Sequence, residues 1–367
     1  MQKEMISASQ AKCIIATFIL GSSMILGGST EAAQDSWISL LMAAVYFIPV
    51  ALIYARIMRL YPEKDIFCIL EILFGKIAGK ALIVLFTWYA LHLTSLVLSN
   101  FTQFIVTTAM PETPPLALSI IMILVTAYIA VSGIETLGKW ALVTLPIIIL
   151  IVVFTIIASI QQMDFSHIQP VMAHSFSDIS STSFTIFTFP FAESVLFLGV
   201  AGSIKIKSSP YKTYIYGVML GALFLLLAML RNIELLGPAL IQQKYFPSFS
   251  AARVIYIGDY FARIEGTVSM NYILSGISKT ALSLLVASKG IAHLFGIKQY
   301  RLIVVPVALL AVALRAILFT NAMQMSDFVK VYQYYAVPFQ IIIPLLVWIA
   351  AEIKTRRNKK IKASAAS

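Results

Sequence analysis

Two apolar segments of this 367-residue chain contain residues that interrupt a helix and could hold a polar ligand. The first segment contains Gly21, Ser22, Ser23 and Met24, and Gly27 follows three residues later. Glycine reaches backbone angles that are closed to other residues, and the N–H groups at a helix start favour an anion such as a carboxylate. The alternative interpretation is that these small residues only allow a neighbouring helix to approach closely.

The second segment contains Phe189, Pro190 and Phe191, followed two residues later by Glu193. Proline lacks an N–H donor and leaves a carbonyl group free one turn earlier, and a carboxylate within a membrane segment faces protein or water. Free carbonyl groups beside a carboxylate suit the ammonium group of a ligand. The alternative is a proline kink next to a protonated glutamate that is satisfied by a hydroxyl such as that of Ser194.

Two other apolar segments carry polar side chains at roughly helical spacing. Tyr89 and Asn100 lie on one side of a segment, where they could line a water-filled cavity or form hydrogen bonds between helices. Asn271, Ser275 and Lys279 form a stripe on the other segment. The Lys279 amine could take the place of a coupling cation near the first interruption. Alternatively, it extends to the lipid headgroups or forms a structural ion pair.

The composition indicates the fold class. Hydrophobic residues make up 60% of the chain and charged residues 12%, with a mean hydropathy of +0.90. Because a soluble protein cannot bury so much apolar surface, we expect an all-α polytopic membrane protein. The apolar runs are continuous rather than alternating, as helices require. Ten spans are expected, over residues 11–29, 37–58, 81–108, 116–132, 140–160, 183–204, 212–230, 267–292, 302–319 and 331–353.

The order of these spans predicts the organisation of the chain. Residues 1–353 are expected to form one membrane domain with halves 1–160 and 183–353, followed by a basic tail over 354–367. Each half has five spans and begins with an interrupted helix, which predicts a 5+5 inverted repeat with broken helices 1 and 6. The amphipathic stretch Ser250–Ile264 is expected to form a helical cap over the outer mouth.

The charge distribution predicts the topology. Most of the 27 Lys and Arg residues lie in segments that are cytosolic if the N-terminus is inside. Because positive charge favours the cytosolic side, we expect both termini there. This asymmetry explains the net charge of +11 without a nucleic-acid partner. The tail is expected to be disordered and attracted to anionic membrane lipid.

Signatures of enzymes are missing from the sequence. It has no glycine-rich phosphate loop, no His-Glu-x-x-His motif and no nucleophile elbow. Cys13 and Cys68 are too few to provide a disulfide framework or a metal pattern. We therefore expect a protein that is not an enzyme and needs no cofactor or metal.

Four elements of the sequence resemble the B subunit of bacterial spore-germination nutrient receptors, in the amino acid–polyamine–organocation superfamily with the LeuT-type fold. These elements are Ile6–Gln10, Phe189–Glu193, Phe249–Ile255 and Phe261–Glu265. The similarity covers essentially the whole chain. It departs from the family at the end of the first span, where residues 26–29 read Leu-Gly-Gly-Ser instead of ending in small-Leu-Pro.

The resemblance implies a germinant sensor in the spore inner membrane. Such a subunit binds a small nutrient, often an amino acid, and works beside a lipoprotein subunit and a larger membrane subunit. The alternative function is an amino-acid or polyamine permease with proton coupling through Glu193, and a third is a scaffolding or channel-like subunit whose pocket is vestigial.

Overall fold

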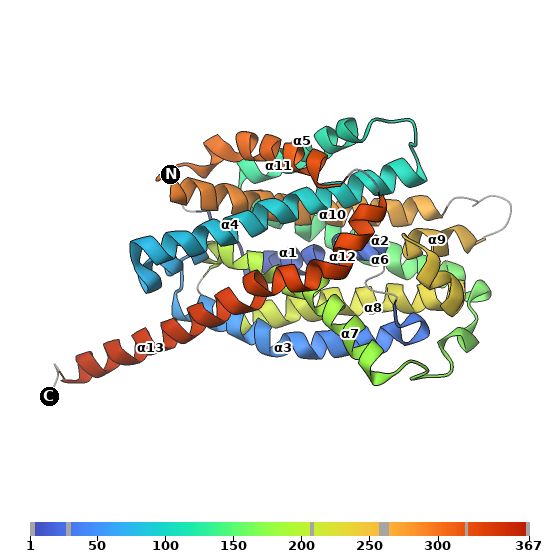
Figure 1. The fold of residues 1–367 in the computed structure, drawn as a ribbon, viewed down its shortest axis with the longest axis horizontal. Coiled ribbons are helices and arrows are strands. Elements are labelled where there is room, and N and C mark those ends of the chain that lie inside the picture. The colour runs from blue at the N-terminus through green and yellow to red at the C-terminus, as the bar shows by residue number, and fades with distance from the viewer. Residues whose placement is uncertain (1–3, 27–30, 206–208, 257–263, 320–321, 365–367) are drawn as a thin grey trace.

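The protein is a bundle of long helices whose two chain ends lie at the same end of the bundle (Figure 1). The computed structural model describes residues 4–26, 31–205, 209–256, 264–319 and 322–364. Within these ranges the only pairing of extended backbone is an isolated bridge between Ile6 and Ile204. The expected Gly27 position lies outside the described residues.

Each expected span coincides with helix, but α8 continues 13 residues past its expected end, and the last expected span is divided between α12 and α13. The α-helices are α1 (Ala8–Leu20), α2 (Ser23–Leu26), α3 (Ser36–Leu60), α4 (Ile66–Thr108), α5 (Pro115–Ser132), α6 (Ile134–Ser159), α7 (Phe176–Ile186), α8 (Pro210–Gln243), α9 (Pro247–Val254), α10 (Glu265–Leu294), α11 (Val304–Leu318), α12 (Ala322–Val337) and α13 (Ile343–Ser364). The shorter turns are η1 (Ala33–Asp35), η2 (Ile160–Gln162), η3 (Phe165–Ile168), η4 (Phe187–Phe191), η5 (Ala192–Gly199), η6 (Ala201–Ser203), η7 (Tyr300–Ile303) and η8 (Pro338–Ile342).

Apolar helices dominate the part of the chain that the structure describes. Eight helical stretches are long and apolar enough to cross a membrane, and α1 is a shorter apolar helix. The remaining expected span, 81–108, lies within α4 after a break at Gly75, where φ is +74°. The prediction of a polytopic all-α membrane protein is therefore confirmed.

Both expected interruptions are present. Helix α1 ends at Leu20 and α2 begins at Ser23, so the helix restarts after two residues. In the second half, α7 passes into the π-type turn η4, where Phe189 leaves helical geometry with φ −139° and ψ 105°. The chain then continues as the 3₁₀ helix η5, which carries Glu193. The proline and glycine positions that weaken a helix in the sequence are the places where it breaks.

Two expectations outside the spans were wrong. The tail is not disordered up to Ser364, because α13 continues through it as one helix. The ion pair between Arg56 of α3 and Glu352 of α13, with an Nε–Oε1 distance of 2.6 Å, fixes α13 just before this extension. The outer amphipathic helix begins earlier than expected and ends at Val254, since α9 spans Pro247–Val254 and Ile255 is extended. Residues 257–263 of the expected stretch lie outside the described residues.

The N-terminal segment fastens the start of α1 to other parts of the bundle. Glu4 accepts hydrogen bonds from Arg301 Nη2 at 2.5 Å and from the Tyr300 hydroxyl at 2.9 Å. Ile6 N–H donates to the Ser203 carbonyl at 2.8 Å. Ser7 then caps α1 through a reciprocal capping box with Gln10. These contacts join the N-terminal segment to η6 and η7.

Close packing of α1 against α8 positions the first broken helix. A Cβ atom at Gly217 of α8 would lie 2.8 Å from Ile15 Cβ and 3.0 Å from the Lys12 carbonyl oxygen. A Cβ atom at Gly221 would lie 3.0 Å from Ile19 Cβ. Small residues of this kind let two membrane helices approach closely.

Gly217→Ala should therefore destabilise the protein, because the added methyl group overlaps with α1. Overpacking of this kind costs about 1–3 kcal/mol. Gly266→Ala is the matched control, since a Cβ atom at this helical position has no heavy atom within 4 Å. Thermal unfolding of the purified variants measures the effect. Equal melting temperatures for the two variants would show that α1 and α8 are not packed as described.

Candidate functional site

A buried ion pair lies where the two broken helices meet. Glu193 of η5 and Lys279 of α10 are both fully buried, and Lys279 Nζ donates to Glu193 Oε2. The ammonium group also lies 4.6 Å from the ring centroid of Phe189 and 5.3 Å from that of Phe18. Of the three sequence-based interpretations of Lys279, the ion pair is observed and extension to the lipid headgroups is not. The ammonium group also lies near the first interruption, where it was expected if it takes the place of a coupling cation.

The same lysine contacts the interruption between α1 and α2. Lys279 Nζ lies 3.4 Å from Ser22 Oγ. A Cβ atom at Gly21 would lie 2.6 Å from Lys279 Cδ and 2.7 Å from the Phe18 carbonyl oxygen, so only glycine fits there. Ser275, one turn before Lys279, donates to the Gly21 carbonyl oxygen at 3.1 Å. The first break, the second break and α10 therefore converge on one ammonium group.

A chain of hydrogen bonds extends from the other carboxylate oxygen. The Tyr332 hydroxyl of α12 donates to Glu193 Oε1 at 2.6 Å, and lies 3.0 Å from the Tyr89 hydroxyl of α4. Gln340 Nε2 donates to the Tyr89 hydroxyl and to the Thr188 carbonyl oxygen, both at 2.8 Å. Because Tyr332 gives its proton to the carboxylate, Tyr89 must be the donor in the contact between the two tyrosines.

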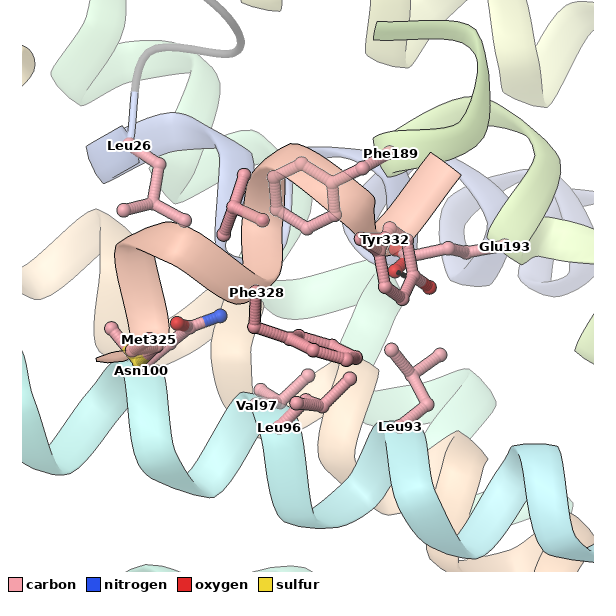
Figure 2. A pocket seen from close by; sticks show the side chains of 11 residues that line it. Leu26, Leu93, Leu96, Val97, Asn100, Phe189, Glu193, Met325, Phe328 and Tyr332 are labelled. Carbon is pink, nitrogen blue, oxygen red and sulfur yellow. Dashed lines mark hydrogen bonds between the residues drawn. The ribbon is translucent and has the colours of Figure 1, made fainter. Parts of the chain in front are cut away.

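The pocket beside this network is mainly apolar. Figure 2 shows Glu193 and Tyr332 at one end, Asn100 at the other and the α4 side chains along one wall. The space not filled by atoms is about 410 Å³, including its open side. The residues that line it are Leu26, Leu93, Leu96, Val97, Asn100, Phe189, Glu193, Met325, Phe328, Val329 and Tyr332. Among the described residues of this lining, Glu193 is the one that carries a charge.

The structure brings some of the predicted site residues together and leaves others in the core. Phe189, Glu193 and Asn100 line the pocket, and Tyr89 reaches it through Tyr332. Gly21, Ser22 and Ser275 lie against Lys279 or its helix. Gly27 is outside the described residues. The remaining predicted residues, which do not line the pocket, are Ser23, Met24, Pro190, Phe191 and Asn271.

Those remaining residues have other surroundings. Phe191 stacks on Phe47 with ring centroids 5.9 Å apart, and its carbonyl oxygen accepts the Ser194 hydroxyl at 2.5 Å. The alternative in which the Ser194 hydroxyl satisfies a protonated Glu193 is therefore not observed, and the hydroxyl that donates to Glu193 is that of Tyr332. Asn271 donates from Nδ2 to the Ile148 carbonyl oxygen at 3.3 Å. Phe191 and Asn271 therefore pack between helices and do not contact the pocket.

The sequence reasoning missed the contribution of α12 and of the turn that follows it. Tyr332, Met325, Phe328 and Gln340 were not selected, although they complete the pocket and the hydrogen-bond chain. Gln340 could have been selected from the sequence, since it lies two residues after a proline within an apolar run. A buried amide at such a position must find hydrogen-bond partners.

The ion pair determines the electrostatic character of the site. The paired carboxylate and ammonium group carry no net charge, so an apolar cavity can lie directly beside them. Removing one partner would leave an uncompensated buried charge, which typically costs 3–5 kcal/mol. The arrangement can accept or donate hydrogen bonds and exchange one ammonium group for another. Among the described residues no cluster of His, Cys, Asp and Glu could hold a metal ion.

Comparisons of sequence identify relatives over the full length. A family profile described as "Spore germination protein" matches residues 5–322. Spore germination protein KB of Bacillus subtilis (strain 168) is 25% identical over 378 residues, covering 100% of both chains. The putative spore germination protein YfkT of the same strain is 26% identical over 339 residues, covering 90% of this chain and 91% of the relative.

Solved structures share the fold. MhsT, solved in complex with L-phenylalanine, aligns with a TM-score of 0.70 and 12% identity, covering 95% of this chain and 89% of that one. Mhp1, a nucleobase-cation-symport-1 family transporter solved with bromovinylhydantoin, gives a TM-score of 0.63 and 12% identity, covering 91% and 76%. The expectation of a transporter-type fold is thus confirmed.

Tyr332→Phe tests the hydrogen-bond chain. A hydrogen bond to a charged group contributes about 1.5–3 kcal/mol, so the loss of this hydroxyl should destabilise the protein by about that amount. Tyr272→Phe is the matched control, because its hydroxyl is also buried but has no hydrogen-bond partner among the described residues. Unfolding of the purified variants provides the comparison. A control variant that is destabilised as much as Tyr332→Phe would contradict the assigned role.

Proposed function

Because the chain belongs to the spore germination protein family, we propose that it is the B-type membrane subunit of a spore germinant receptor. It binds a small nutrient, an amino acid, in the pocket beside Glu193. With a lipoprotein subunit and a larger membrane subunit it triggers germination, and it lies in the spore inner membrane with both termini in the cytosol. The observation that carries this proposal is an apolar pocket that ends at a neutralised pair of buried charges.

The pocket lining favours a ligand without net charge. Apart from Asn100, Glu193 and Tyr332, its side chains are aliphatic or aromatic. Glu193 is already paired with Lys279, so no free charge in the lining would balance a ligand of net charge. A zwitterionic amino acid with an apolar side chain meets these conditions. A polyamine, which carries at least two positive charges, does not.

The ligand can be oriented from the same contacts. The side chain of the ligand would pack against the wall formed by Leu93, Leu96 and Val97. The ligand ammonium group would face Glu193. The ligand carboxylate would face the α1–α2 segment, from which Leu26 is the described residue that lines the pocket. Asn100 lies in the same lining and adds a neutral polar group.

Binding would act on the broken helices through competition for Glu193. A ligand ammonium group that approaches the carboxylate competes with Lys279, whose ammonium group also contacts Ser22. A ligand shifts a conformational equilibrium only by its difference in affinity for the two states. The displaced Lys279 ammonium group would be a buried unpaired charge unless the ligand carboxylate pairs with it, so a zwitterion would replace both partners of the ion pair. A modest difference in affinity can then change the position of Lys279 and with it the α1–α2 break.

An amino-acid permease with proton coupling through Glu193 is the second candidate. The observation in its favour is the fold shared with Mhp1, which is described as a transporter. Uptake of a labelled amino acid by liposomes that contain the purified protein separates the two. The receptor proposal expects binding without accumulation inside the liposomes.

Val97→Trp tests the pocket. Val97 is buried and lines the pocket, so the larger ring should occupy ligand space. Steric overlap of this kind costs about 1–3 kcal/mol. If that cost falls on ligand binding, the nutrient concentration for half-maximal germination should rise about 5- to 150-fold. Dose–response curves of spores measure the shift, with the amount of the subunit checked by immunoblot.

Val84→Trp is the matched control, because Val84 is on the same helix but is 51% exposed and does not line the pocket. Its response should match that of the natural protein. A Val97→Trp variant that is present at normal levels and keeps the normal midpoint would contradict the assignment of this pocket to the nutrient.

A further inference from the structure

A second cleft, separate from the nutrient pocket, lies between α3, α4 and α13. Its lining includes Lys64, just after α3, and Lys354 of α13, together with the polar side chains of Thr355 and Asn358. Leu60 and Ile72 form apolar parts of the same surface. The space not filled by atoms is about 780 Å³, open solvent included, and none of its described lining residues is acidic. The cleft therefore combines two positive charges, neutral hydrogen-bonding groups and apolar contact.

The cleft lies at the ends of two membrane-crossing stretches. One stretch runs over Ala33–Leu60 and the other over Asp327–Asn358, so Leu60 and Asn358 are their last residues. Residues at the ends of such stretches lie at the level of the lipid headgroups. By the charge asymmetry of the sequence this is the cytosolic face, which carries the negative surface potential of the membrane.

The position of Lys354 is fixed by the structure. Lys354 Nζ donates to the Ile72 carbonyl oxygen at 2.7 Å, which ties α13 to the first part of α4. The Arg56–Glu352 pair ties α13 to α3 half a turn away. A lysine ammonium group has three donors, so this bond leaves Lys354 able to contact an anion in the cleft.

We propose that this cleft binds the headgroup of an anionic phospholipid. Lys64 and Lys354 contact the phosphodiester, Thr355 and Asn358 provide neutral hydrogen bonds, and Leu60 and Ile72 contact the glycerol and the first methylene groups. Basic clefts between membrane helices on the cytosolic side suit such headgroups. The site holds one lipid in a defined position, in addition to the diffuse attraction of the basic extension of α13, and does not depend on which nutrient the receptor binds.

Retention of phosphatidylglycerol by the full-length protein tests this site. The protein is placed in phosphatidylcholine nanodiscs that contain a minor fraction of phosphatidylglycerol, and retained lipid is counted by native mass spectrometry after release. Two lysines at a membrane surface together provide about a 30-fold preference for anionic lipid. Lys64→Gln/Lys354→Gln should therefore weaken retention about 30-fold, and Lys64→Gln alone, which keeps the bond from Lys354 to Ile72, about fivefold.

The control variant is Lys76→Gln/Lys80→Gln, which removes the same charge from two exposed lysines of α4 that do not line the cleft. It should retain phosphatidylglycerol as the natural protein does. Equal loss in the control and the cleft variant would show diffuse attraction only and overturn the proposal. Displacement of the lipid by inorganic phosphate at equal concentration would indicate a site for a free anion and would also overturn it.

Discussion

The fold depends on keeping one carboxylate and one ammonium group together, both fully buried, in the centre of the bundle. Transfer of each ion from water costs several kcal/mol even after relaxation, and pairing offsets this only when the geometry is good and the remaining lone pairs are satisfied. Glu193 meets the second condition through Lys279 on one oxygen and Tyr332 on the other. Five separate segments must therefore keep their positions for the pair to exist: the α1–α2 break, α4, η5, α10 and α12.

This requirement explains why the helices break where they do. A side chain at Gly21, where the first helix ends, would overlap with Lys279. An uninterrupted helix through Phe189 and Pro190 would not present the Phe189 ring to the ammonium group. The pocket lies on the same carboxylate, so ligand binding and the packing of the broken helices involve the same atoms. In a site with this arrangement, binding of a ligand can change the position of the helices, as both sensing and transport require.

The spans and the helix breaks could be predicted from the sequence. Apolar runs, glycine clusters and Pro190 identify spans and breaks because hydrocarbon penalises every unsatisfied backbone group. The partner of Lys279 was not visible, since 86 residues separate it from Glu193 and an ion pair is a property of the packed bundle. Tyr332 and Gln340 were missed because buried and lipid-facing positions look alike in an apolar helix. The helical tail was missed because contacts of α13 with α3, not its own composition, support it.

The measurement that tests the ion pair most directly is a double-mutant cycle on the stability of the purified protein. Glu193→Gln and Lys279→Met each leave a buried charge alone and should cost about 3–5 kcal/mol, whereas the double variant should cost clearly less than the sum. Lys289→Met, on the same helix but half-buried and 4.0 Å from Asp65, should cost much less than Lys279→Met. Additive costs for the two central substitutions would contradict the account, because they would show that the two charges do not stabilise each other.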